Sequence, residues 1–400
     1  MTELAVTGIG ELVTNASGLP GDLGLIHDAA VVVREGRVAW AGLEADLPTE
    51  HRELTELDVE GRAVLPGFVD SHTHLVFGGD RADEFARRLR GEDYGDILAD
   101  GGGIHATVDA TRAAGDDELL TAATERAMRM LRHGTTTVEV KSGYGLTTAD
   151  ELRQLQVAAQ LAETTPLEVV PTFLGAHVPD RDIRADDHVA LVVDEMLPVC
   201  APFAEGIDVF CDRGAFDVAQ ARTVLEAGRR HGLAPRIHAE QLTHTGAAKL
   251  AARVGAASAD HLDLASAEDA GALADAGVVA VLLPAASFSM VSVQAPGRML
   301  WDAGVTVALA TDCNPGTSYV DSMPLVVAIA CLEMGLTPEE ATWAATRGGA
   351  LALLRPDHGM LVPGSIGDLV VLDAPSYLHL PYRPGADLVW RVVKDGSVVV

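Results

Sequence analysis

Two histidines stand two residues apart where an apolar run ends, in Val69-Asp-Ser-His72-Thr-His74. In an extended strand, residues i and i+2 point to the same side, so both imidazoles can face one ion. Two surface histidines at a strand end are the alternative interpretation of this pair. Spacing alone does not separate the two, and a metal site therefore requires further ligands from elsewhere in the chain.

Further polar side chains follow other apolar runs, in Ile237-His238, Asp260-His261 and Ala310-Thr-Asp312, and His238 and Asp312 among them are candidate ligands. A lone histidine is more often a hydrogen-bonded core residue, and a lone aspartate after a strand often caps the next helix. Their meaning changes if all the runs are strands of one barrel, because the strand ends then share one rim. Three nitrogens and a carboxylate on that rim, from His72, His74, His238 and Asp312, suit zinc or ferrous iron.

A second metal ion would normally need a bridging ligand at the end of the fourth strand. That run, Ile207 to Asp212, has no lysine to carry a carbamate, and Lys141 belongs to the second strand. We therefore expect one metal ion. Cys211 and Asp212 are expected to be structural residues, with a place beside the metal site as the alternative.

The elements that must position these ligands alternate through the middle of the chain. Helical patterns separate most of eight short β-rich runs, at 64–72, 135–141, 167–177, 207–212, 235–240, 257–261, 278–284 and 305–312. Eight strands, each followed by a crossover, predict a (β/α)₈ TIM-like barrel in the α/β class. A doubly wound sheet is the alternative, but no Gly-x-Gly-x-x-Gly follows a first strand.

Three helix starts carry capping signals. Thr148 with Glu151 predicts a capping box, Asp217 predicts the N-cap of a helix that stops at Gly232, and Thr337 precedes a proline at the first helical position.

Both chain ends have the texture of strands and tight turns. Ala29–Val33 and Val38–Ala41 form a hairpin pattern with Gly36 at the turn. Neither end could bury a core alone. We therefore expect residues 1–62 and 359–400 to form one small β-sandwich domain beside a barrel that spans 63–358 and holds the metal site.

Composition excludes several classes of protein. The 400 residues are 48% hydrophobic and 22% charged, which is ordinary for a globular protein. The sequence contains no uninterrupted apolar stretch of about 18 residues, so no transmembrane helix is expected. The N-terminus lacks the basic and apolar regions of a secretory signal. None of the four cysteines lies in a Cys-x-x-Cys pair, so we expect a reduced, cytoplasmic protein without disulfides.

The formal net charge of −29 disfavours nucleic acid and anionic membranes as partners. The same field opposes an anionic substrate. A small molecule that carries a carboxylate would therefore need local positive charge from the site itself.

Pro66-Gly-Phe-Val-Asp-Ser-His-Thr-His74 resembles the entry motif of the amidohydrolase superfamily, as do the flanking β-domain and Gly364-Ser-Ile-Gly-Asp-Leu-Val-Val371. Narrower motifs resemble the imidazolonepropionase family, and the similarity spans nearly the whole chain. These are Val76-Phe-Gly-Gly-Asp-Arg81, Lys141-Ser-Gly-Tyr-Gly-Leu146, Phe173-Leu-Gly-Ala-His177, His238-Ala-Glu-Gln-Leu242 and Thr311-Asp-Cys-Asn-Pro-Gly-Thr317. The first motif is specific only to the superfamily, whereas Lys-Ser-Gly-Tyr-Gly and Asp-x-Asn-Pro-Gly-Thr are far narrower.

The resemblance implies a reaction of histidine degradation, in which water opens 4-imidazolone-5-propanoate to N-formimidoyl-L-glutamate. It implies one divalent ion, zinc or iron (Zn²⁺ or Fe²⁺/Fe³⁺), and a homodimer as the habit of that family. The metal ligands would be His72, His74, His238 and Asp312. The substrate contacts would be Arg81, Tyr144, His177, Gln241, Asn314, Gly316 and Thr317.

Gln241 stands where related deaminases, and some members of this family, carry glutamate. Glutamine orients a substrate by donating and accepting hydrogen bonds, but it does not shuttle a proton at neutral pH. Proton transfer is therefore expected from His261, Asp312 or both. The side chain of Glu240 should alternate away from the metal face.

Arg81 would supply the positive charge that the chain otherwise lacks, because its fork matches a carboxylate. A surface salt bridge with Asp80 or Asp83 is the alternative. Tyr144 lies between two glycines, as expected for a loop over the mouth of the barrel. An apolar lid is the alternative interpretation of this residue.

Three other functions remain open at this point. The first is another cyclic amidohydrolase or a deaminase acting on a small nitrogen heterocycle, and Gln241 counts mildly against deamination. The second is a non-catalytic scaffold, which would have no need of intact metal ligands. The third is a solute-binding protein, which the missing signal segment disfavours.

Overall fold

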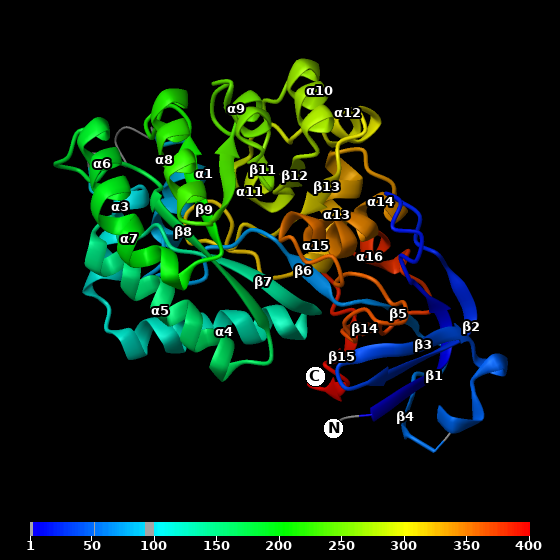
Figure 1. Ribbon diagram of the computed structural model, residues 1–400. Helices are drawn as coiled ribbons and strands as arrows, with labels where there is room; N and C mark the ends of the chain where they lie inside the picture. Colours follow the sequence, from blue (N-terminus) through cyan, green and yellow to red (C-terminus); the bar gives the residue numbers. More distant parts are fainter. Residues whose placement is uncertain (1–2, 52, 93–99) are drawn as a thin grey trace.

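The computed structural model describes residues 3–51, 53–92 and 100–400, which fold into two β-sheets and the helices around them (Figure 1). Met1 and Thr2, with which the predicted small domain begins, lie outside the described residues. No described helix is long and apolar enough to cross a membrane.

Eight parallel strands form the larger sheet, in the order β13-β12-β11-β10-β9-β8-β7-β6. The sheet closes between its first and last strands, because Thr73 bridges Cys313 in parallel and Asp312 N–H donates to the carbonyl of His72 over 3.0 Å. Each predicted run overlaps one strand of this sheet, which confirms the (β/α)₈ barrel. The strands are β6 Phe68–Asp70, β7 Thr135–Lys141, β8 Glu168–Ala176, β9 Gly206–Cys211, β10 Ala234–Ala239, β11 Ser258–His261, β12 Val279–Leu282 and β13 Val307–Leu309.

The run predicted at 64–72 divides at Gly67 into two strands that belong to different sheets. β5 (Ala63–Pro66) lies in the smaller sheet, and β6 begins the barrel. A Cβ on Gly67 would lie 2.2 Å from Thr136 Oγ1, so only glycine fits where the chain crosses between the sheets.

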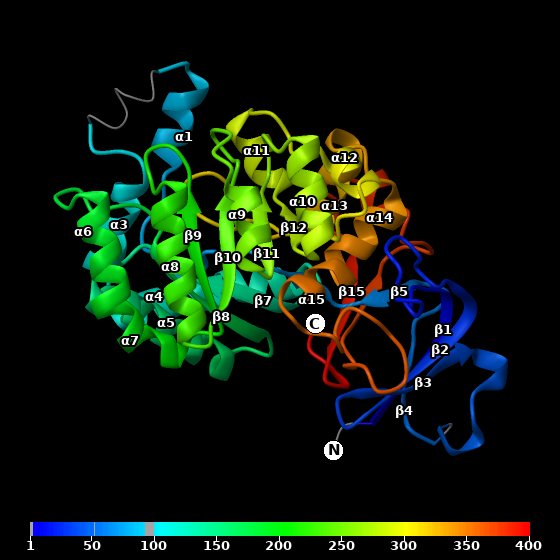
Figure 2. The same ribbon diagram turned by 45° about the horizontal axis from the view of Figure 1, so that its top comes forward.

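The smaller sheet joins both chain ends beside the barrel, as Figure 2 shows. Its order is β16-β15-β14-β5-β1-β2-β3, with β4 paired to β1. The predicted hairpin is present and turns at Glu35 and Gly36, both with positive φ (52° and 75°). The strands are β1 Glu3–Leu12, β2 Ile26–Arg34, β3 Arg37–Leu43, β4 Thr55–Asp58, β14 Leu369–Leu372, β15 Val389–Lys394 and β16 Ser397–Val398.

The helices follow the strands around the barrel, and two of the three predicted caps are confirmed. Asp217 and Thr337 each close a capping box. The box predicted at Thr148 is wrong: Thr147 is the N-cap, and Glu151 bonds the preceding loop instead. The α-helices are α1 Ala82–Leu89, α3 Ile104–Ala113, α4 Asp116–Arg132, α5 Thr148–Thr164, α6 Ala185–Leu191, α7 Leu197–Cys200, α8 Val218–Arg230, α9 Ala247–Val254, α10 Ala267–Ala276, α11 Pro284–Met290, α12 Gly297–Asp302, α13 Met323–Glu333, α14 Pro338–Trp343, α15 Gly349–Ala352 and α16 His379–Tyr382.

One layer of the barrel interior is charged rather than apolar. Lys141 of β7 contacts Asp208 of β9 and Asp260 of β11, and all three side chains are fully buried. Contacts between alternate strands are possible only across the interior, where alternate strands supply each layer of side chains. Charged groups this deep need partners of opposite charge or hydrogen bonds.

Candidate active site

Asp312 and two histidines bring three ligand atoms together where the barrel closes. Asp312 Oδ1 lies 3.5 Å from His72 Nε2 and 3.5 Å from His74 Nε2. Ligand atoms about 2.0–2.2 Å from a tetrahedral ion lie roughly 3.3 Å apart, so this spacing suits a metal ion. His238 extends the set, because its ligand atom lies within 4.8 Å of those of His72 and His261 in one group and of His74 and His177 in another.

Two histidine nitrogens at this site are buried and make no hydrogen bond within the protein. Neither His72 Nε2 nor His238 Nε2 has a hydrogen-bond partner, although buried polar atoms almost always have one. Burial holds the pKa of His72 and His74 well below the usual histidine value, so both imidazoles are neutral at pH 7. A neutral imidazole is the form that coordinates a metal, and the residues present therefore fit a divalent cation.

Two buried aspartates orient these histidines from behind. Asp260 Oδ2 accepts from His72 Nδ1 over 2.7 Å, and Asp208 Oδ2 lies 3.0 Å from His238 Nδ1. The contact with Asp260 leaves His72 Nε2 beside Asp312, whereas His238 lies within ligand distance of the histidines rather than of Asp312. Sequence analysis missed both aspartates, for which the one available signal is a charged residue within a buried barrel strand.

Left-handed backbone marks the same rim. His261 and Asp312, which end or follow β11 and β13, have φ values of 73° and 53°, and Glu240 after β10 has 54°. Such conformations are uncommon for residues other than glycine and gather at functional sites. Glu240 turns its carboxylate to the N–H groups of Thr245, Gly246 and Ala248 at the start of α9, which agrees with its expected direction away from the metal face.

Tyr144 and His177 line the site beside His74. Their ring centroids lie 5.8 and 5.1 Å from that of His74. Burial raises the pKa of Tyr144, so its phenol stays protonated and can donate a hydrogen bond. His177 Nδ1 donates to the carbonyl of Gly143 over 3.0 Å, which leaves Nε2 with a free lone pair. Burial lowers the pKa of His177 to about 3.

Two residues of α5 hold the loop that carries Tyr144. Glu151 accepts the N–H groups of Gly143, Gly145 and Leu146, and Gln154 accepts that of Tyr144 over 3.1 Å. Tyr144 itself is only 4% exposed, so it packs inside the mouth of the barrel rather than above it.

Arg81 is paired, but with neither of the aspartates considered from the sequence. Its Nε and Nη2 bond the two carboxylate oxygens of Glu84, the first over 2.8 Å. Its Nη1 lies against Gly316, where a Cβ would stand 2.2 Å from it. One edge of the guanidinium is therefore held by Glu84, and the Nη1 side faces the loop after β13.

Asn314 gives that loop its shape. Its Oδ1 accepts the N–H groups of Gly316 and Thr317, each over 2.8 Å, and its Nδ2 donates to the carbonyl of Asp312 over 2.7 Å. Thr317 Oγ1 in turn lies 3.3 Å from Asp312 Oδ2. The amide of Asn314 is thus used within the loop, and Gly316 and Thr317 are placed beside Asp312.

Gln241 follows β10 and is half-buried, three positions after His238. His261 is 2% exposed, and its ring centroid lies 5.2 Å from that of His238.

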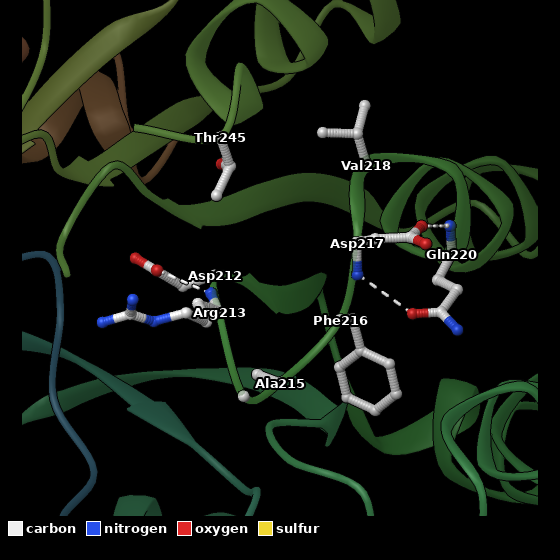
Figure 3. A pocket seen from close by; sticks show the side chains of 9 residues that line it. Asp212, Arg213, Ala215, Phe216, Asp217, Val218, Gln220 and Thr245 are labelled. Atoms are coloured by element: carbon white, nitrogen blue, oxygen red, sulfur yellow. Dashed lines mark hydrogen bonds between the residues drawn. The ribbon is translucent and has the colours of Figure 1, made fainter. Parts of the chain in front are cut away.

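A separate surface hollow of about 400 Å³ is lined by residues 212–218, Gln220 and Thr245. Figure 3 shows these residues. The hollow includes none of the metal-ligand candidates. Asp212 bonds the N–H of Leu242 there, in keeping with its expected structural role.

Comparisons with known proteins bear on this arrangement. The model of the amidohydrolase family matches residues 83–400. An imidazolonepropionase from Mycolicibacterium smegmatis is 52% identical over 402 residues, covering 100% of this chain and 98% of the relative. One from Salinispora arenicola is 54% identical over 402 residues, covering 99% and 98%.

Solved structures show the same fold at lower identity. A triazine hydrolase variant has a TM-score of 0.78 at 19% identity, covering 100% of this chain and 94% of the other. A zinc-bound adenosine deaminase from Xanthomonas campestris has a TM-score of 0.74 at 20% identity, covering 99% and 92%. At this identity the likeness supports the fold alone.

Proposed function

The chain belongs to the amidohydrolase family and, within it, to the imidazolonepropionases, and from that premise we propose how its side chains divide the reaction among themselves. The enzyme hydrolyses the ring amide of 4-imidazolone-5-propanoate to N-formimidoyl-L-glutamate in histidine degradation. Water adds to the ring carbonyl carbon, the carbon–nitrogen bond breaks, and the departing nitrogen gains a proton.

A divalent metal ion serves this reaction, and the proposal is one ion, Zn²⁺ or iron, held by His72, His74, His238 and Asp312. When bound, such an ion lowers the pKa of water from about 15.7 toward roughly 7 and polarises a carbonyl. The observation that carries the proposal is the meeting of Asp312 Oδ1 with two buried histidine nitrogens at 3.5 Å each.

The substrate carboxylate binds the Nη1 side of Arg81. Glu84 occupies the opposite edge of the guanidinium and fixes its plane, so the substrate need not displace Glu84. Gly316 and Thr317 approach the substrate from the loop after β13, and Asn314 acts by holding that loop. Tyr144 donates a hydrogen bond from its phenol, His177 accepts a hydrogen bond at Nε2, and Gln241 orients the ring.

His261 and Asp312 move the proton. Burial holds the pKa of His261 well below the usual histidine value, so its imidazole is neutral and able to accept. Its Nδ1 is buried without a hydrogen-bond partner, which leaves that atom available. Asp312, whose Oδ2 lies 3.3 Å from Thr317 Oγ1, is the second proton carrier.

The test is a turnover assay with 4-imidazolone-5-propanoate before and after chelation, with elemental analysis of the same samples. About one equivalent of zinc or iron should be present, and activity should vanish on chelation and return with the ion. Two equivalents in the active form would contradict the single-ion assignment.

A further inference from the structure

Lys141 is a fully buried cation that the reaction does not use. It ends β7, and its ammonium lies 2.8 Å from Glu139 Oε2, 2.8 Å from Asp208 Oδ2 and 3.6 Å from Asp260 Oδ2. Burial alone would lower the pKa of this amine, but Asp208, Glu139 and Asp260 outweigh it and raise the pKa. Lys141 is therefore charged, and the carboxylates occupy its donors.

The carboxylates beside Lys141 are the ones that orient the metal-ligand histidines. Asp260 Oδ2 bonds His72, and Asp208 Oδ2 lies 3.0 Å from His238. One ammonium thus contacts both aspartates that lie against the metal-ligand histidines. Glu139 belongs to the same cluster but contacts neither histidine; Thr172 and Arg236 hold it instead.

The buried cluster around Lys141 contains more carboxylates than cations. Counted as formal charges, the carboxylates of Glu139, Asp208, Asp260 and Asp312, which form one chain of contacts, outnumber the cations Lys141 and Arg236 by two. A divalent ion completes the balance, and before it binds the excess is largest. An uncompensated buried charge is among the costliest features a folded protein can contain.

We infer that Lys141 is the built-in counter-cation of the metal-free site, a positioning residue that keeps Asp208 and Asp260 in place until the ion arrives. This rests on the proposed metal site and goes beyond it, because it assigns Lys141 to the apo state. Removal of its charge should therefore destabilise the metal-free protein more than the metal-bound protein. A purely structural lysine would stabilise both forms equally.

The test compares melting temperatures of chelator-treated and Zn²⁺-saturated full-length protein for wild type and Lys141→Met. The matched control is Lys394→Met, since Lys394 is also buried and paired, 3.0 Å from Asp368, but in the smaller sheet. For Lys141→Met, the zinc-induced rise in Tm should exceed that of wild type by about 5 °C. For Lys394→Met the rise should match wild type.

A rescue variant separates charge from packing. Lys141→Met with Glu139→Gln removes one anion along with the cation, so the apo Tm should recover part of its loss. Zinc affinity, measured by competition with a chromophoric chelator, should be no weaker in Lys141→Met than in wild type. An equal fall in apo and zinc-bound Tm, no rescue, or weaker zinc binding would each overturn the inference.

The wild-type measurement separates failure of the proposed metal centre from failure of the role of Lys141. If the Tm of the wild type did not change when Zn²⁺ was added, both the proposed metal centre and the role of Lys141 would be overturned. A wild-type response with an identical response in Lys141→Met would leave the metal centre standing and remove only the role of Lys141.

Discussion

Gly316 leaves room for the guanidinium of Arg81, which we propose binds the substrate carboxylate. A Cβ at this position would lie 2.2 Å from Arg81 Nη1, so it would push the guanidinium away without removing its charge or its partner Glu84. Substitution of Arg81 itself would leave Glu84, which is 8% exposed, without its cation. Gly316 is therefore the cleaner place to test the carboxylate contact.

We predict that Gly316→Ala raises KM for 4-imidazolone-5-propanoate by about 10- to 150-fold, the equivalent of one charge-assisted hydrogen bond. Gly271→Ala is the control, because Gly271 lies in α10 with nothing within 4 Å of the added Cβ. Steady-state kinetics with an analogue that lacks the carboxylate complete the test. An equal loss with that analogue would show that Arg81 does not bind the carboxylate.

His261 lies beside the metal ligands but is assigned to proton transfer. We predict that His261→Ala lowers kcat by about 10²–10⁴-fold, the range for a general acid or base, while metal content stays near that of wild type. Because its ligand atom lies within 4.8 Å of those of His72 and His238, elemental analysis must accompany the kinetics. Loss of the ion in this variant would make His261 a ligand instead.

At the scale of elements, β8 is fastened at its first residue, away from the catalytic rim. Glu168 accepts from Arg355 Nε over 2.7 Å and from His358 Nε2 over 2.6 Å. Burial alone would raise the pKa of Glu168, but the bonds from His358 and Arg355 outweigh it and lower the pKa to about 2. Burial likewise opposes the charge on His358, and Glu168 raises that pKa above its usual value.

These shifts set a pH window for stability. The lowered pKa of Glu168 stabilises the fold above about pH 4.5 and loses its effect as pH falls toward 2. The raised pKa of His358 stabilises the fold below about pH 6.5 and loses its effect as pH rises through the folded value. Both contributions are complete between those limits.

We predict that Glu168→Gln lowers the free energy of unfolding by about 1–3 kcal/mol in that window. The difference from wild type should shrink below pH 3, where the wild-type carboxylate is also being neutralised. Urea unfolding at a series of pH values measures it, with kcat at pH 7 as the control. If the difference in unfolding free energy did not depend on pH, the ionised Glu168 would not be its cause. A fall in kcat would show that Glu168 affects the active site.

At the scale of the whole molecule, the formal charge of −29 opposes a substrate that carries a carboxylate. Salt screens charges beyond about 10 Å at 0.1 M, whereas the short contact with Arg81 is screened far less. We predict that kcat/KM rises about two- to fivefold between low and physiological ionic strength. An uncharged analogue should show no rise, and a fall with the natural substrate would mean that the site itself attracts anions at long range.

The sequence by itself determined the barrel and the position of the ligand candidates. Apolar runs of strand length with helices between them specify the barrel, and its topology places every carboxyl strand end on one rim. His72, His74 and Asp312 therefore meet although they are far apart in the chain. The sequence did not reveal that the strand before Gly67 joins the smaller sheet and the strand after it joins the barrel, because both strands are fully buried and look alike.

Only the tertiary structure decided which groups stand behind those ligands. His72 bonds Asp260 across 188 positions of sequence, and Lys141 meets carboxylates from three strands. Such pairs have no local spacing, because they depend on which side chains the barrel turns inward at one height. The partner of Arg81 is local by contrast. Glu84, rather than Asp80 or Asp83, holds Arg81, because it lies three residues on, one turn into α1, where it reaches the guanidinium.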